Sequence, residues 1–281
     1  MAHQIILPRT MQIGKDASKQ ITETLASLNC SKPLLITDNV MVELGYADRI
    51  TSYLAEHSIA LDVFSDTVPE PTVASISAGV EALRAKPYDC IIALGGGSPI
   101  DSAKAIGILG KYGGEMRDYK FPRVVNEEGL PIIAVPTTAG TGSEVTRFTI
   151  ITDEQTSEKM LCVGSGFMPT AALIDFSLTL SLPQRVTADT GIDALTHAIE
   201  AYVSRKANLY SDAQALSAMA LIAPNLRTVF ADGKNENARE AMMLGSTLAG
   251  IAFSNASVAL VHGMSRPIGA AFHVPHGLSN A

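Results

Sequence analysis

Residues 90–104 have the sequence CIIALGGGSPIDSAK, in which an apolar run meets three glycines and then a helix start. The run CIIAL predicts a buried strand. Ser98 is expected as the N-cap, with Pro99 at the first helical position and Asp101 three residues after the cap. Consecutive glycines let a ligand approach the backbone, and a helix start offers free N–H groups and positive potential. This arrangement favours a pyrophosphate site. The alternative is a glycine-rich turn that binds nothing.

The spacing of these glycines does not match GxGxxG, so the Rossmann fingerprint cannot be invoked. Short apolar runs nevertheless alternate with helical patterns up to about residue 180, which predicts a parallel sheet with helices on both faces. The segment 148–164 differs, because two apolar runs flank the polar turn DEQTSE, and it predicts a hairpin at the domain edge. The expected strands are 32–38, 60–66, 90–96 and 131–137, and the expected helices between them include 16–28 and 72–85.

Strand patterns end after SLPQRVT, and the rest of the chain predicts helices over 187–204, 209–230 and 237–264. The last of these is apolar on nearly every side, as in a helix buried within a helical domain. We therefore expect an α/β domain over residues 1–180 and an all-α domain over residues 181–281.

Bulk composition narrows the class of protein. A chain of 281 residues with 47% hydrophobic content can bury a large core, and its net charge of −7, with scattered Lys and Arg, argues against nucleic acid or an anionic membrane as a partner. Cys30, Cys90 and Cys162 stand far apart without a CxxC pair, as in a reducing compartment. The N-terminus has no signal-peptide pattern, and no apolar run is as long as a membrane span. These features predict a cytoplasmic protein.

Two further segments carry polar groups at strand ends. PTTAGTGSEVT (136–146) gathers Thr137, Thr138, Thr141, Ser143 and Thr146 around glycines after a buried strand. Such a loop can contact phosphate, ribose or carboxamide, or it can satisfy only its own backbone. Asp38 ends the strand KPLLITD, where a carboxylate can accept hydrogen bonds from an adenosine ribose or can simply cap a helix.

Four residues in the last third of the chain form a mixed nitrogen and oxygen donor set. Asp193 and His197 are four residues apart in the helical pattern GIDALTHAIEAY, so both side chains leave one face. His262 and His276 follow in VHGMSRPIGAAFHVPHG, each directly before a glycine. One carboxylate and three imidazoles suit a divalent metal such as Fe²⁺ or Zn²⁺. If the four converge, coordination positions remain for a substrate.

In this order, GGGSPIDSAK, PTTAGTGSEVT, GIDALTHAIEAY and HGMSRPIGAAFHVPHG resemble the iron-containing (group III) alcohol dehydrogenases. The resemblance spans nearly the whole chain from about residue 30 and implies a fold similar to dehydroquinate synthase, with cofactor and metal in the cleft between the domains. It implies Asp193, His197, His262 and His276 as metal ligands. An acidic residue at position 38 implies NAD rather than NADP. The implied dinucleotide contacts are Asp38, Gly96, Gly97, Ser98, Asp101, Thr137, Thr138, Thr146, Lys159 and Leu178.

The sequence departs from the family pattern at two places. Arg266 stands where many relatives have a further histidine, so a role for that position does not transfer. The family usually continues for about a hundred more residues of helix, a length comparable to a small domain, whereas this chain ends five residues after His276. Either the chain is partial or the helical domain is smaller than in relatives, and the fold class is expected to be an α/β domain followed by an apparently truncated all-α domain.

The function implied is reversible oxidation of a primary alcohol or short diol to an aldehyde or ketone, with hydride transfer to NAD and the metal as a Lewis acid. His273, three residues before His276, is the candidate catalytic proton relay, or else a histidine that only packs near the site. Relatives imply a homo-oligomer, a dimer or larger. Two alternatives stay open: a dehydroquinate synthase-like lyase, which would need a basic cluster where only Arg266 is near in sequence, and a non-catalytic nucleotide-binding remnant.

Overall fold

The computed structural model describes residues 2–272 and 274–281. Its first part is a six-stranded parallel sheet with the strand order β1-β8-β5-β4-β2-β3. The predicted parallel sheet and all four predicted strands are confirmed. Two strands at one side of the sheet, over residues 10–13 and 171–174, had not been predicted. The strands are β1 (Thr10–Ile13), β2 (Pro33–Ile36), β3 (Asp62–Phe64), β4 (Cys90–Gly95), β5 (Ile132–Pro136) and β8 (Ala171–Ile174).

Alternating side chains of the central strands divide the core between the two faces of the sheet. Ile91 and Ala93 of β4 pack with helices α4 (Val73–Arg84) and α5 (Gly97–Tyr112), whereas Ile92 and Leu94 pack with the helices of the opposite face. Strands with both faces covered are continuously apolar, which explains the run CIIAL. The helices of the opposite face are α1 (Ile21–Ser27), α2 (Asn39–Glu43) and α3 (Tyr46–Ala55).

The predicted hairpin is confirmed as a separate antiparallel pair, β6 (Phe148–Asp153) and β7 (Glu158–Val163). Its apolar residues Ile151, Met160 and Cys162 pack against the same core cluster as α4 and α5. The hairpin therefore packs beside α4 and α5, on the face of the sheet that these helices cover. Short 3₁₀ segments occur at Ala17–Gln20, Met116–Tyr119, Ser143–Val145, Ser165–Phe167 and Phe176–Thr179.

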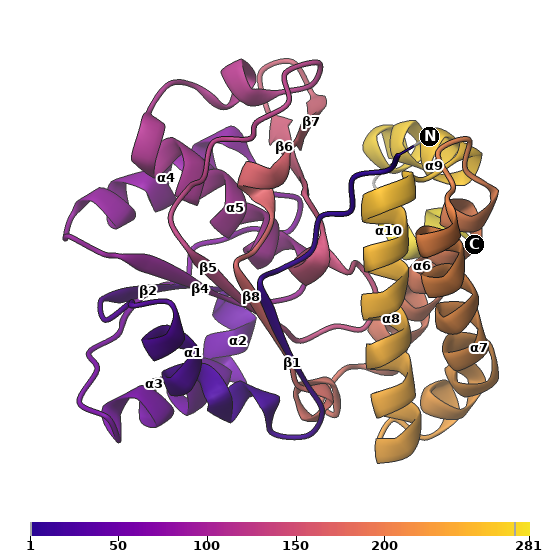
Figure 1. The fold of residues 1–281 in the computed structure, drawn as a ribbon, viewed down its shortest axis with the longest axis horizontal. Helices are drawn as coiled ribbons and strands as arrows, with labels where there is room; N and C mark the ends of the chain where they lie inside the picture. The colour runs from indigo at the N-terminus through magenta and orange to yellow at the C-terminus, as the bar shows by residue number, and fades with distance from the viewer. Residues whose placement is uncertain (1, 273) are drawn as a thin grey trace.

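The second part is helical: α6 (Gln184–Val203), α7 (Leu209–Ala231), α8 (Glu236–Ala256), α9 (Leu260–Phe272) and α10 (His276–Ser279). Figure 1 shows α6, α7 and α8 stacked together beside the sheet. The predicted single helix over 237–264 is wrong, because the chain breaks between α8 and α9. Ser257 there has φ of 68°, a left-handed conformation that a helix cannot contain. The break places His262 in the first turn of α9.

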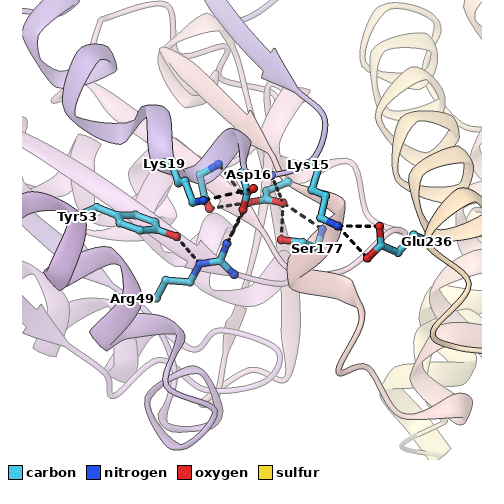
Figure 2. A network of polar contacts seen from close by, with 9 residues as sticks. Lys15, Asp16, Lys19, Arg49, Tyr53, Ser177 and Glu236 are labelled. Atoms are coloured by element: carbon cyan, nitrogen blue, oxygen red, sulfur yellow. Dashed lines mark hydrogen bonds and ion pairs between the residues drawn. The ribbon is translucent and has the colours of Figure 1, made fainter.

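Contacts between the α/β part and the helices include two near the N-terminus. The N-terminal arm bonds α8 through Ile6, whose N–H donates to Asn255 Oδ1 over 2.9 Å, and the arm runs from β1 toward the helical part in Figure 1. Figure 2 shows a polar network at the turn after β1, in which Lys15 bonds both carboxylate oxygens of Glu236 at the start of α8. Within residues 2–272 and 274–281, none of the helices combines the length and hydropathy needed to cross a bilayer.

Candidate metal and cofactor site

The glycine turn after β4 makes one wall of the candidate site. The structure places Gly96 at the N-cap and begins α5 at Gly97, so the expectations of Ser98 as the cap and Pro99 as the first helical residue are wrong. A glycine cap brings no side-chain oxygen, so the first N–H groups of α5 receive no side-chain cap bond. A Cβ on Gly97 would lie 2.8 Å from Thr141, so this turn touches the loop over residues 136–146 directly.

That loop, called the hydroxyl loop below, is held by a buried lysine. Lys104 is fully buried on α5, and its Nζ donates to Ser143 Oγ over 2.9 Å, to Thr146 Oγ1 over 3.1 Å and to the Phe148 carbonyl over 2.8 Å. Burial lowers the pKa of Lys104 to about 8, although Asp101 and Glu144 oppose the shift. Lys104 thus fixes the hydroxyl loop from beneath, a role that the sequence patterns did not indicate.

Asp101 also serves this loop. Its carboxylate accepts a hydrogen bond from Ser143 Oγ over 2.5 Å and one from the Ile150 N–H over 3.2 Å, and burial raises its pKa. Asp101 therefore ties α5 to the hydroxyl loop and to β6, instead of closing a capping box with Ser98. The alternative of a purely self-satisfied loop does not account for Thr137, whose buried hydroxyl lacks a partner among the described residues.

A cavity of about 290 Å³ lies between the two parts of the chain. Its polar lining includes the helix start at Gly97 and Ser98, the hydroxyl loop at Thr146, and Lys159 of β7, which pairs with Glu70 over 2.7 Å. The four predicted metal ligands line the same cavity. Of the predicted cofactor residues, those in the lining are Gly97, Ser98, Asp101, Thr146 and Lys159.

The other predicted cofactor residues are not in this lining. Asp38 caps α2, its carboxylate accepting from the Met41 N–H over 2.9 Å, so the capping interpretation is the one observed. The Leu178 side chain packs in the core beneath the sheet. Gly96 and Thr138 lie directly behind the lining, where a Cβ on Gly96 would be 3.3 Å from Thr138. Asp38, Gly96, Thr137, Thr138 and Leu178 remain proposals as cofactor contacts.

The four candidate metal ligands converge on one carboxylate oxygen. The Nε2 atoms of His262, His276 and His197 lie 3.4, 3.6 and 3.8 Å from Asp193 Oδ1. Bonds of 2.0–2.2 Å to zinc place neighbouring donors of a tetrahedral site about 3.3–3.6 Å apart. The separations of His262 and His276 from Asp193 Oδ1 lie within this range, and the ligand atoms of these three residues all lie within 4.8 Å of one another. His197, 3.8 Å from the same oxygen, lies outside this group and would have to move toward it for all four residues to bind one ion.

The protonation states also suit metal binding. Burial alone would raise the pKa of Asp193, but His197 and the two other imidazoles lower it to about 2. Burial lowers the pKa of His197 to about 4, so its ring is neutral at neutral pH. An ionised carboxylate and a neutral imidazole are the forms that bind metals. His197 is further fixed by stacking on Phe253, with ring centroids 4.2 Å apart.

Two residues around this donor set were missed in the sequence. Asn280 Nδ2 donates to Asp193 Oδ1 over 2.7 Å and lies 3.4 Å from His262 Nε2. The amide NH2 group of Asn280 thus lies between the same donor atoms that a metal would bind. Glu200 on α6 lies 2.5 Å from His262 Nδ1. Its position three residues after His197 on the same helix face is the signal that could have found it. The predicted His273 lies outside the described residues, as does the side chain of Arg266.

Two family models together match most of the chain. The family described as iron-containing alcohol dehydrogenase matches residues 8–176, and the C-terminal part of that family matches residues 187–281. Long-chain-alcohol dehydrogenase 1 of Geobacillus thermodenitrificans is 41% identical over 281 residues, covering 99% of this chain and 71% of the relative.

Two solved structures superimpose closely on the chain. A 1,3-propanediol oxidoreductase has a TM-score of 0.96 and 38% identity, over 100% of this chain and 73% of the other. Sulfoacetaldehyde reductase from Bifidobacterium kashiwanohense, solved with NAD+, has a TM-score of 0.94 and 33% identity, over 100% and 74%. The chain belongs to the iron-containing alcohol dehydrogenase family.

Proposed function

We propose that this chain catalyses the reversible, NAD-linked and metal-dependent oxidation of a primary alcohol or short diol to an aldehyde or ketone by hydride transfer. One observation carries the proposal: three imidazole Nε2 atoms surround Asp193 Oδ1 at 3.4–3.8 Å, in the cavity that also contains the helix start at Gly97 and Ser98. Membership in the family and the NAD+ bound to a structural relative support the same assignment of cofactors.

In this proposal Asp193, His197, His262 and His276 hold the metal. When bound, a divalent metal of this kind lowers the pKa of an alcohol hydroxyl and favours the alkoxide. Asp193 supplies one negative charge, so a divalent ion would leave the site with net positive charge toward a substrate oxygen. Iron is favoured by the family, and the donor set also suits zinc.

The α/β part would bind and orient the dinucleotide. The N–H groups at the start of α5 and the positive end of its dipole would favour an anion such as pyrophosphate there. Lys159 adds a cation at the same cavity, and Asp38 at the end of β2 would disfavour a 2′-phosphate. We propose NAD as the cofactor on this basis, with NADP bound more weakly. The boundary near residue 180 belongs to the same proposal, the helical part carrying the metal ligands.

The substrate would enter between the cofactor wall and the metal ligands. Apolar side chains line this part of the cavity, among them Phe148, Phe253 and Val258, and they exclude water from the reacting groups. A short apolar or diol carbon chain fits such walls. His273 is proposed as the group that handles the substrate-side proton. We further propose a cytoplasmic location and a homo-oligomer, dimer or larger, which subcellular fractionation and light scattering would test.

The lyase alternative calls for a basic cluster to hold a phosphorylated acid. Among the described residues that line the cavity, Lys159 is the one Lys or Arg, and it pairs with Glu70. The non-catalytic alternative does not explain a buried carboxylate held ionised beside three imidazoles. Dehydrogenation is therefore the function that the geometry supports best.

The test compares two aspartates of α6. Asp193→Asn removes the central carboxylate, whereas Asp189→Asn, one turn earlier, changes a carboxylate that faces Arg185 over 3.6 Å. Both variants and the parent are loaded anaerobically with Fe²⁺ and given primary alcohols and short diols with NAD or NADP. We expect NADH formation by the parent and by Asp189→Asn, and loss of both metal and turnover in Asp193→Asn. Metal-loaded parent protein that oxidises no alcohol would overturn the proposal.

A further inference from the structure

Glu200 is a buried carboxylate that the proposed reaction leaves without a role. It lies on α6 three residues after His197 and seven after Asp193, so all three side chains leave the same face of the helix. Glu200 is 3% exposed, and among the ion pairs of the described residues its carboxylate has no Lys or Arg partner. Burying a carboxylate is costly unless several donors satisfy it. The groups that donate hydrogen bonds to the Glu200 carboxylate therefore indicate what it holds in place.

Those donors lie at the start of α9 and at Ala259, the residue directly before it. Oε1 accepts from the Val261 N–H over 2.5 Å, and the His262 N–H lies 3.4 Å from both carboxylate oxygens. A carboxylate at a helix N-terminus satisfies free N–H groups and faces the positive end of the dipole. Glu200 therefore fixes the backbone that carries His262.

The same carboxylate also fixes the imidazole ring. Glu200 Oε2 lies 2.5 Å from His262 Nδ1, and an ionised carboxylate can only accept, so Nδ1 carries the hydrogen. In a neutral ring the lone pair is then on Nε2, the atom that lies 3.4 Å from Asp193 Oδ1. Glu200 therefore faces both the backbone and the ring nitrogen of His262.

We infer that Glu200 is a positioning residue for the metal centre, which holds His262 as the Nδ1–H tautomer with Nε2 aimed at the ion. This inference rests on the proposed function, because it assumes that His262 is a ligand. Partners of this kind typically change metal affinity by about 10- to 100-fold when removed.

The informative variant is Glu200→Gln, which keeps the shape and removes one acceptor. The single amide oxygen can accept from the start of α9, and the amide NH2 then faces His262 Nδ1. The ring satisfies that donor by moving its hydrogen to Nε2, which can no longer bind a metal. A residue that served only to cap α9 would not produce this change, because the cap acceptor survives. Glu240→Gln, an exposed glutamate on α8, is the matched control.

The first experiment measures Zn²⁺ affinity by competition with a chromophoric chelator, without substrate or turnover. We expect the parent and Glu240→Gln to bind one Zn²⁺ per chain with equal affinity, and Glu200→Gln to bind about 10- to 100-fold more weakly. Equal affinity of Glu200→Gln and the parent would overturn the inference while leaving the proposed function intact. A parent protein that binds no Zn²⁺ or Fe²⁺ would instead overturn the proposed function.

The second experiment needs no variant, so it decides the inference even if Glu200→Gln does not fold. Nitrogen-15 NMR of the histidine rings in metal-free parent protein distinguishes the two tautomers, and His262→Asn assigns the signal. We expect the Nδ1–H form for His262. A dominant Nε2–H form would overturn the inference, whatever the metal affinity of the variants.

Discussion

Replacing Lys104 with methionine tests whether the buried ammonium holds the hydroxyl loop. Lys104 is fully buried, with three hydrogen bonds to Ser143, Thr146 and the Phe148 carbonyl, and it lies 3.7 Å from Asp101 Oδ1. Methionine matches the length of the side chain but offers no donor. The variant therefore isolates the contribution of the charge and its hydrogen bonds from that of packing.

Two opposing effects determine the magnitude. Removing one partner of a buried charge pair typically costs about 3–5 kcal/mol, because the remaining charge is uncompensated. Against this, the lowered pKa of Lys104 indicates that burial of the ammonium is itself unfavourable, so its removal relieves part of the loss. We therefore expect Lys104→Met to lower the free energy of unfolding by about 3 kcal/mol, the lower end of that range.

The measurement is urea unfolding followed by circular dichroism, together with NAD titration of the folded variant. Lys111→Met is the matched control on the same helix, because Lys111 is exposed, bonds the carbonyls of residues 128 and 129 and lies over the Tyr112 ring. It should change stability by no more than about 0.5 kcal/mol. Lys104→Met should also bind NAD more weakly, since Ser143 and Thr146 line the cavity. If the two variants were equally stable, the account of Lys104 would be refuted.

Three further changes have defined outcomes. Glu70→Gln removes the 2.7 Å ion pair with Lys159 at the cavity, so NAD should bind tighter by up to about fivefold, because exposed pairs are worth at most about 1 kcal/mol; weaker binding by calorimetry would contradict this. Burial raises the pKa of Cys162 from 9.0 to about 12. The protonated thiol therefore contributes its full share to the free energy of unfolding below pH 9, and this contribution is lost as the pH rises toward 12. Between pH 9 and 10.5 the parent should lose about 2 kcal/mol more in urea unfolding than Cys162→Ala, and parallel curves would refute the assignment. Gly250→Ala places a Cβ 2.9 Å from the hydroxyl-loop backbone and should destabilise by about 1–3 kcal/mol, whereas Gly263→Ala, with nothing within 4 Å, should not; equal thermal midpoints would count against this contact.

The central strands could be predicted because burial on both faces makes them continuously apolar. β1 and β8 were missed, although β2 is equally short. The sequence TMQI of β1 mixes polar and apolar residues and AALI of β8 is compatible with helix, so pairing with a neighbouring strand determines their conformation. The split between α8 and α9 was missed for a different reason. The segment around Ser257 is compatible with helix in its composition, and only the tertiary position of α9 requires the left-handed residue.

The candidate metal set was found in the sequence because Asp193 and His197 share a helix face. The residues that support the site were not found, because a lysine or glutamate on a helix is normally exposed. Lys104 and Glu200 are buried by partners 39–62 residues away in the sequence, which no local pattern contains. The role of Asp38 illustrates the same limit. Its capping of α2 and its proposed effect on cofactor choice are both compatible with one aspartate at the end of a strand.

The most direct test of the proposed metal-dependent dehydrogenase is a titration of turnover against bound metal. Metal-free protein is loaded anaerobically with increasing Fe²⁺, and NADH formation from a short diol is followed at each occupancy. The account predicts no turnover without metal, and a rate that rises in proportion to occupancy and saturates at one ion per chain. Turnover that persists without metal, or its absence at full occupancy with NAD bound, would contradict it.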